Sequence, residues 1–327
     1  MTPDRPNIIL VYTDQQRYDA LGCNGNGLIR TPNLDAFAGQ GVRFTGAFTT
    51  TPVCVPSRVA TMTGRYGHAT GSWSNGQLIS PRETHLPGWL SAAGYRTAII
   101  GKDHCFERLR AEVFDHVRNC SHSGPEPTGG PADERIRAAR AGKMQVPFAD
   151  DPVPAEENST FMLFREASEY IESAAREGSV PFFLWLSIPD PHPPYMVSQP
   201  YASMYDDVEL PPPAWAEGEM ENKPYRQRLI VEWNRCARDY PGGGIDRLRR
   251  IYYGMVSCID DAFGEFAARL ERAGLAEGTI VAFTSDHGDY LGDHGMIRKG
   301  PHLYDALARV PLLVRGARGF LSRSLIA

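Results

Sequence analysis

Continuous apolar runs, bounded by proline, glycine or polar residues, recur along the chain. They lie at residues 7–12, 95–100, 181–187, 279–284 and 310–315. Runs of this length without polar alternation are typical of strands that are buried on both faces, as in a parallel sheet. Shorter apolar pairs predict a further strand between residues 42 and 48.

Longer stretches between these runs have apolar residues at helical spacing. The clearest are 159–177 and 246–273, each followed by a glycine that favours a helix end. Shorter helices are predicted at 31–38 and 86–93. Strands and helices in alternation predict an α/β fold, with a mainly parallel central sheet sandwiched by helices. Residues 105–158 and 196–243 are polar or proline-rich and are interpreted as loops, which makes His116 and His122 surface residues.

Polar residues suited to metal binding or proton transfer follow several of the predicted strands. They are Asp14, Gln15, Lys102, His104, His192, Asp286 and His287. Ligand sites in open α/β sheets lie beyond the carboxyl ends of the strands, so these side chains are expected to meet in one site. Taken one at a time, each also fits an ordinary turn or surface position.

Residues 52–65 join a cysteine to a proline, a serine and an arginine. Pro56 is predicted as the first residue of a helix, where its missing N–H is not needed. The free N–H groups of that helix start would face an anion, and Arg58 adds a fixed positive charge one turn further in. Such surroundings lower the pKa of a thiol, so Cys54 is a candidate nucleophile. The alternative is a buried cysteine that packs as a small apolar residue.

The signature Cys-Val-Pro-Ser-Arg at 54–58, followed by Thr-Gly-Arg at 63–65, resembles that of the type I sulfatases, members of the alkaline-phosphatase-like superfamily. Gly-Lys-Asp-His at 101–104 and Ser-Asp-His-Gly at 285–288 fit the same family pattern. The resemblance implies an alkaline-phosphatase/sulfatase-like fold and hydrolysis of a sulfate monoester. Residues 1–327 would then form the family's N-terminal catalytic domain without its C-terminal subdomain, which would leave the strand at 310–315 as an exposed sheet edge.

The resemblance also implies a modified nucleophile and a metal. In that family a separate formylglycine-generating enzyme oxidises the cysteine to Cα-formylglycine, and a hydroxyl of the hydrated aldehyde attacks sulfur. The implied metal ligands are Asp14, Gln15, the modified Cys54, Asp286 and His287. Gln15 stands where many members have a second aspartate. Oxygen-rich ligands favour Ca²⁺, with Mn²⁺ or Mg²⁺ as alternatives, and Arg58 would stabilise the nucleophile together with the metal.

The remaining implied roles concern the sulfate group and the protons. Lys102, His192 and Lys299 would hold the sulfate, and either Lys299 or His192 would protonate the leaving oxygen. His104 would take a proton from the second hydroxyl and so restore the aldehyde. Asn75 falls in a loop of glycine, serine and asparagine, where related enzymes place an amide against the anionic oxygens of the substrate.

Composition limits the partners and the location. A net charge of −5 gives no reason to expect nucleic acid as a partner. The 6 cysteines lack the paired spacing of a disulfide scaffold or a zinc site. No apolar run is long enough to span a membrane and no secretory leader is visible, so a cytoplasmic protein is expected. The expected partners are a small-molecule or saccharide sulfate ester and the formylglycine-generating enzyme.

Two alternative functions stay open. A phosphonate or phosphate diester hydrolase of the same superfamily would use the same nucleophile. Lys102 and His104 favour the sulfatase, because those hydrolases tend to carry neutral hydroxyl residues at these positions. The second alternative is an inactive, truncated protein that only binds anions. Turnover of an aryl sulfate compared with that of an aryl phosphonate discriminates between the two hydrolases.

Overall fold

The computed structural model describes residues 5–126, 130–143, 148–178, 180–233, 244–300 and 302–317. Its centre is an eight-stranded sheet with the strand order β2-β10-β9-β1-β7-β3-β4-β5. The strands of this sheet are β1 Asn7–Asp14, β2 Val42–Arg43, β3 Arg96–Gly101, β4 His116–Ser121, β5 Gly124–Pro125, β7 Phe182–Pro191, β9 Thr279–Ser285 and β10 Leu312–Arg315. The strands from β9 to β4 are parallel, and antiparallel strands flank them at both ends. The prediction of a mainly parallel α/β sheet is confirmed.

β1 lies at the centre of the sheet, and its two faces enter two different cores. It pairs in parallel with β7 on one side and with β9 on the other. Ile9 and Val11 lie in one core, whereas Tyr12 lies in the other. The neighbouring strand β7 is buried at every position. Burial on both faces explains why these strands read as continuous apolar runs rather than alternating ones.

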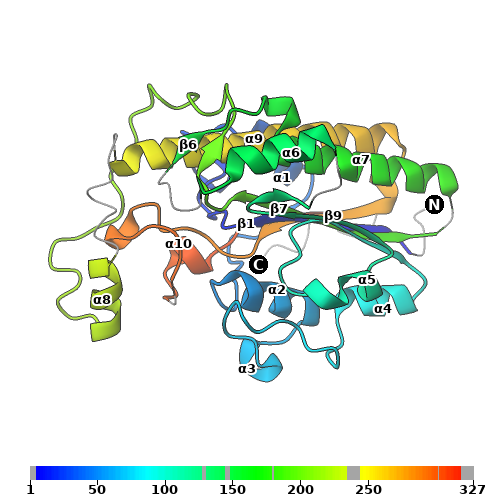
Figure 1. Ribbon diagram of the computed structural model, residues 1–327, viewed down its shortest axis with the longest axis horizontal. Helices are drawn as coiled ribbons and strands as arrows, with labels where there is room; N and C mark the ends of the chain where they lie inside the picture. Colours follow the sequence, from blue (N-terminus) through cyan, green and yellow to red (C-terminus); the bar gives the residue numbers. More distant parts are fainter. Residues whose placement is uncertain are drawn as a thin grey trace.

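Helices cover both faces of the sheet (Figure 1). Above the sheet in this view lie α1 Pro32–Gly39, α6 Pro131–Arg140, α7 Ser159–Glu177 and α9 Gly244–Arg272. Below it lie α2 Cys54–Thr63, α3 Gly67–Thr70, α4 Leu86–Ala92 and α5 Arg110–Val113. The helices α8 Tyr225–Trp233 and α10 Asp305–Ala308 lie at the left of the view, toward the carboxyl ends of the parallel strands. Among the described residues, no helix has both the length and the apolar surface that a membrane crossing requires.

Several helices and strands lie in segments whose composition indicates loops. The strand β4 pairs with β3 and β5. The helices α6 and α8 lie in the same two segments. β4 lies near the sheet edge, and within it only Cys120 is fully buried, so the strand has no apolar run to reveal it. The short strands β6 Ala149–Asp150 and β8 Met196–Val197 form a separate small sheet. Residues 234–243 of the second predicted loop lie outside the described residues.

The strand predicted at 310–315 is not a sheet edge. β10 pairs with β9 on one side and with β2 on the other, and Leu313 is fully buried. The chain before α2 continues along this border, since the N–H of Phe44 donates to the carbonyl of Leu312 at 2.9 Å. The prediction of an exposed edge at β10 was therefore wrong, because residues 42–44 cover it.

Candidate active site

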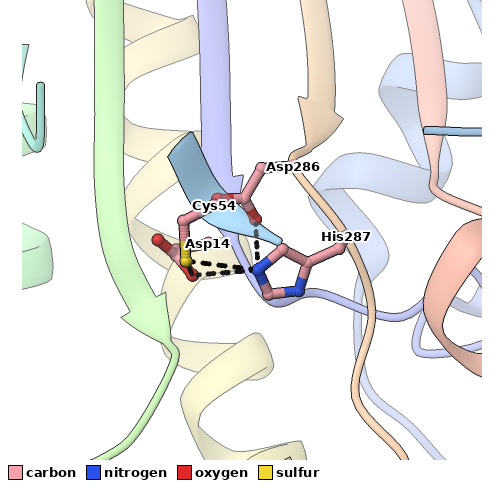
Figure 2. Close-up of side chains that lie close together, drawn as sticks. All are labelled: Asp14, Cys54, Asp286 and His287. Carbon is pink, nitrogen blue, oxygen red and sulfur yellow. Dashed lines mark hydrogen bonds and ion pairs between the residues drawn. The ribbon is translucent and has the colours of Figure 1, made fainter. Parts of the chain in front are cut away.

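Four potential metal ligands meet where β1 and β9 end and α2 begins. Asp14 is the last residue of β1, Asp286 and His287 follow β9, and Cys54 opens α2. One ligand atom of each lies within 4.8 Å of the others, and all four residues are buried. Figure 2 shows the His287 ring facing the other three side chains. Its Nε2 lies 3.4 Å from Cys54 Sγ, 3.6 Å from Asp286 Oδ1 and 3.8 Å from Asp14 Oδ1.

The start of α2 places Cys54 at a helix N-terminus. α2 begins at Cys54 itself, after Val53 in an extended conformation, so the prediction that Pro56 is the first helical residue was wrong by two positions. Pro56 fits there because N–H groups throughout the first turn lack helical partners. Asn75 satisfies one of them: its Oδ1 accepts a hydrogen bond from the N–H of Val55 at 3.1 Å. The exposed Asn75 thus lies directly beside Cys54.

Arg58 is fully buried and joins the two carboxylates. Its Nη2 donates to Asp14 Oδ2 at 3.0 Å and its Nε to Asp286 Oδ2 at 3.1 Å. Its Nη1 donates to the carbonyl of Lys102 at 2.9 Å and to Ser187 Oγ at 2.8 Å. The guanidinium therefore ties α2 to the middle of β7 and to the carboxyl ends of β1, β3 and β9. A buried charge is tolerated only with such pairing, so Arg58 holds the geometry of the acids.

Two lysines complete the charge balance around Cys54. Lys102 Nζ contacts Asp14 Oδ2, and Lys299 Nζ lies 2.8 Å from Cys54 Sγ. Burial raises the pKa of the Cys54 thiol, but the surrounding cations, led by Lys102 and Lys299, hold it well below its usual range. Burial likewise raises the pKa of Asp14, but Lys102 and other positive groups outweigh it and hold that pKa well below normal. The site therefore favours negative charge at position 54.

The chain around this cluster matches one protein family. The Sulfatase family model matches residues 6–324. The chain belongs to the sulfatase family. An arylsulfatase of Clostridium perfringens is 32% identical over 340 residues, which cover 95% of this chain and 68% of that protein. A choline-sulfatase of Rhizobium meliloti is 28% identical over 338 residues, which cover 97% of this chain and 64% of that one.

A solved structure extends the similarity to the fold of the sulfatase-family chain. The phosphonate monoester hydrolase of Agrobacterium radiobacter superposes with a TM-score of 0.77 at 25% identity. That match covers 96% of this chain and 68% of the other. The chain thus spans about two thirds of the length of these relatives.

The donor set of this sulfatase-family site suits a divalent cation. His287 Nδ1 donates to the carbonyl of Gly288 at 2.9 Å, which leaves Nε2 for the cluster. Histidine ligands of metals are commonly oriented by such a second hydrogen bond. Burial lowers the pKa of His287, but the charge of Asp286 outweighs it, so the net shift is upward. The carboxylates thus stabilise positive charge in this pocket, and a bound cation would supply that charge.

Gln15 borders the cluster but has partners on both sides. Its backbone N–H donates to Asp286 Oδ1 at 2.9 Å, and its Nε2 donates to Asp289 Oδ2. Its Oε1 accepts from Lys299 Nζ at 3.0 Å. Lys299 thus bridges the amide oxygen of Gln15 and the sulfur of Cys54. Because Asp289 accepts a hydrogen bond from the amide nitrogen of Gln15, the amide oxygen faces Lys299 and the cluster.

The two other predicted histidines lie differently. His192 follows β7, and its Nδ1 donates to the carbonyl of Pro193 at 2.7 Å. Burial and then Lys299 lower the pKa of His192 to about 4, although the charge of Asp14 and then a hydrogen bond with Cys54 oppose them. His192 thus lies at the site. His104 is half-buried, and among the described residues no hydrogen bond joins it to the cluster; its Nδ1 is buried without a partner.

His122 belongs to this site, although it was predicted to be a surface residue. It directly follows β4, and its side chain is only 16% exposed. Its Nε2 lies 2.7 Å from Lys102 Nζ, and its ring stacks on that of His192 with centroids 3.6 Å apart. Burial and then Lys102 lower the pKa of His122 well below its usual range. The signal that identifies it is its position directly after a strand, but β4 itself is too polar to recognise.

Proposed function

We propose that this chain hydrolyses sulfate monoesters through a formylglycine derived from Cys54, with a divalent cation bound beside it. The observation that carries the proposal is the position of Cys54 at a helix N-terminus, against two carboxylates, a histidine and Lys299. The names of the arylsulfatase and choline-sulfatase relatives support sulfate-ester hydrolysis. Because the chain spans about two thirds of these relatives, its activity, its assignment as an N-terminal catalytic domain and its cytoplasmic location stay predictions.

Asp14, Asp286 and His287 would hold the cation, with the oxygen of Gln15 and position 54 completing the set. Ca²⁺ is favoured because most of these ligands are oxygens, and Mn²⁺ and Mg²⁺ are the alternatives. When bound, the cation supplies Lewis-acid stabilisation of negative charge on the attacking oxygen of the hydrated formylglycine. Arg58 would act mainly by holding Asp14 and Asp286 in place, since its four hydrogen bonds go to protein groups.

The lysines would bind the sulfate group and move the leaving-group proton. Lys102 and Lys299 both bring positive charge to Cys54, where the charge of a sulfate ester needs compensation. Lys299 or His192 would protonate the leaving oxygen; Lys299 Nζ lies 2.8 Å from Sγ and so borders the reacting group. His192 Nδ1 donates a hydrogen bond to the carbonyl of Pro193, so Nε2 is the ring nitrogen that would face the substrate. His104 would take the proton of the second hydroxyl.

A phosphonate or phosphate diester hydrolase is the second candidate, because the similar solved structure is named as a phosphonate monoester hydrolase. We expect kcat/KM for 4-nitrophenyl sulfate to exceed that for 4-nitrophenyl phenylphosphonate by about 100-fold or more, since the sulfate ester presents three non-bridging oxygens to Lys102 and Lys299, whereas the phosphonate presents two and a phenyl group. Both substrates release 4-nitrophenol, so one assay compares them. The opposite preference would assign the diester hydrolase. Anion binding without turnover of either substrate, in protein that carries formylglycine, would indicate the inactive alternative.

A further inference from the structure

The ammonium of Lys102 has two hydrogen-bond partners among the described residues, and they lie on different elements. Its Nζ contacts Asp14 Oδ2 at the end of β1 and lies 2.7 Å from His122 Nε2 after β4. A lysine ammonium has three N–H donors and no acceptor, so the contact with His122 is a hydrogen bond from Nζ to the ring nitrogen. With two N–H bonds engaged, the direction of the third is determined.

The placement of His122 is built into the fold. Its ring lies parallel to that of His192, with an interplanar angle of 13°. Its backbone carbonyl accepts from Arg140 Nη1 at 3.5 Å, and Arg140 Nη2 is paired with Asp190 at 3.1 Å. Asp190 lies two residues before His192 and also accepts from Thr160 Oγ1 at 2.7 Å. One buried ion pair thus connects the backbones that carry both histidines.

We propose that His122 is a positioning residue for Lys102: its Nε2 accepts a hydrogen bond from the ammonium and so directs the remaining N–H toward the sulfate group of the substrate. This inference rests on the proposed function, in which Lys102 binds sulfate. Without the imidazole acceptor, the only described partner of the ammonium is the carboxylate of Asp14, and nothing fixes its rotation. The substrate would then meet a lysine turned toward the carboxylates rather than toward the anion.

Two substitutions separate the hydrogen bond from the ring stacking. His122→Gln keeps an acceptor near the position of Nε2 but loses the ring, whereas His122→Phe keeps a ring and loses the acceptor. We expect His122→Phe to raise KM for 4-nitrophenyl sulfate, and the Kd of inorganic sulfate measured by calorimetry, by about 10- to 100-fold. We expect His122→Gln to stay within about 3-fold of the unaltered protein in both. His116→Gln, at the start of the same strand, is the matched control and should change neither value.

The outcomes discriminate clearly. If His122→Phe binds sulfate normally and His122→Gln does not, His122 acts by stacking on His192 and the proposal is overturned. Equal losses in both variants, or no loss in either, overturn it as well. Melting curves verify folding, and His122→Leu replaces the phenylalanine variant if that one does not fold. If the unaltered protein neither binds sulfate nor hydrolyses the ester, the proposed function itself fails, and the inference fails with it.

Discussion

Cys54→Ala is expected to reduce kcat/KM for a sulfate ester on the order of 10⁴-fold or more, because it removes the proposed nucleophile rather than a supporting group. Sγ of Cys54 lies 2.8 Å from Lys299 Nζ and 3.4 Å from His287 Nε2. Among the described residues, no other cysteine has such contacts. The measurement is release of 4-nitrophenol by purified protein from a host that modifies the cysteine.

The matched control is Cys23→Ala. Cys23 is half-buried in the turn Gly22–Asn24, away from the cluster, and its backbone N–H donates to Asp35 Oδ1 at 2.7 Å. This variant should retain activity within about 2-fold, since loss of a small half-buried side chain there leaves the site untouched. Activity of Cys54→Ala close to that of the Cys23 control would show that position 54 does not carry the reaction.

Asp14→Asn is expected to weaken the affinity for the metal by at least about 100-fold and to lower kcat/KM by at least about 100-fold. The purified variant should therefore also contain less metal. The substitution removes a negative charge from the four-residue cluster and also takes a partner from Arg58 and Lys102. The melting temperature should fall too, because two buried cations lose part of their compensation. Elemental analysis of the folded fraction, together with turnover at saturating Ca²⁺, measures both effects.

Asp260→Asn provides a buried carboxylate away from the cluster for comparison. The carboxylate of Asp260, in α9, accepts from the N–H groups of Asn33 and Leu34 at the start of α1. Its amide replacement should cost about 1 kcal/mol of stability, as for loss of a helix cap, with unchanged metal content. If Asp14→Asn keeps its metal while Asp260→Asn behaves as expected, Asp14 is an ordinary carboxylate at a strand end.

The parts of the fold that could be predicted are those in which burial is two-sided. Every residue of β1, β3, β7 and β9 is buried or partly buried, so their apolar runs stand out and their ends locate Asp14, Lys102, His192 and Asp286. The long helices α7 and α9 bury one stripe each, which produces a clear period. The roles of the site residues depended on the family resemblance, because an aspartate after a strand is also a common turn residue.

The parts that could not be predicted depend on tertiary contacts. β4 is a polar strand near the sheet edge that forms by pairing with β3. The sequence shows no sign of this strand, so the position of His122 directly after it could not be predicted. The start of α1 is capped by Asp260 from α9, over two hundred positions away, rather than by its own Thr31. The pairing of β2 with β10 likewise joins two segments that are far apart in the sequence, so no local pattern predicts it.

The most direct test of the central claim is the chemical state of residue 54 in active protein. Peptide mass spectrometry of protein produced with a formylglycine-generating enzyme should show an aldehyde in place of the Cys54 thiol, and turnover of 4-nitrophenyl sulfate should rise in proportion to the modified fraction. Protein produced without that enzyme should carry the thiol and show no turnover. Full turnover by protein whose Cys54 is entirely an unmodified thiol would contradict the mechanism.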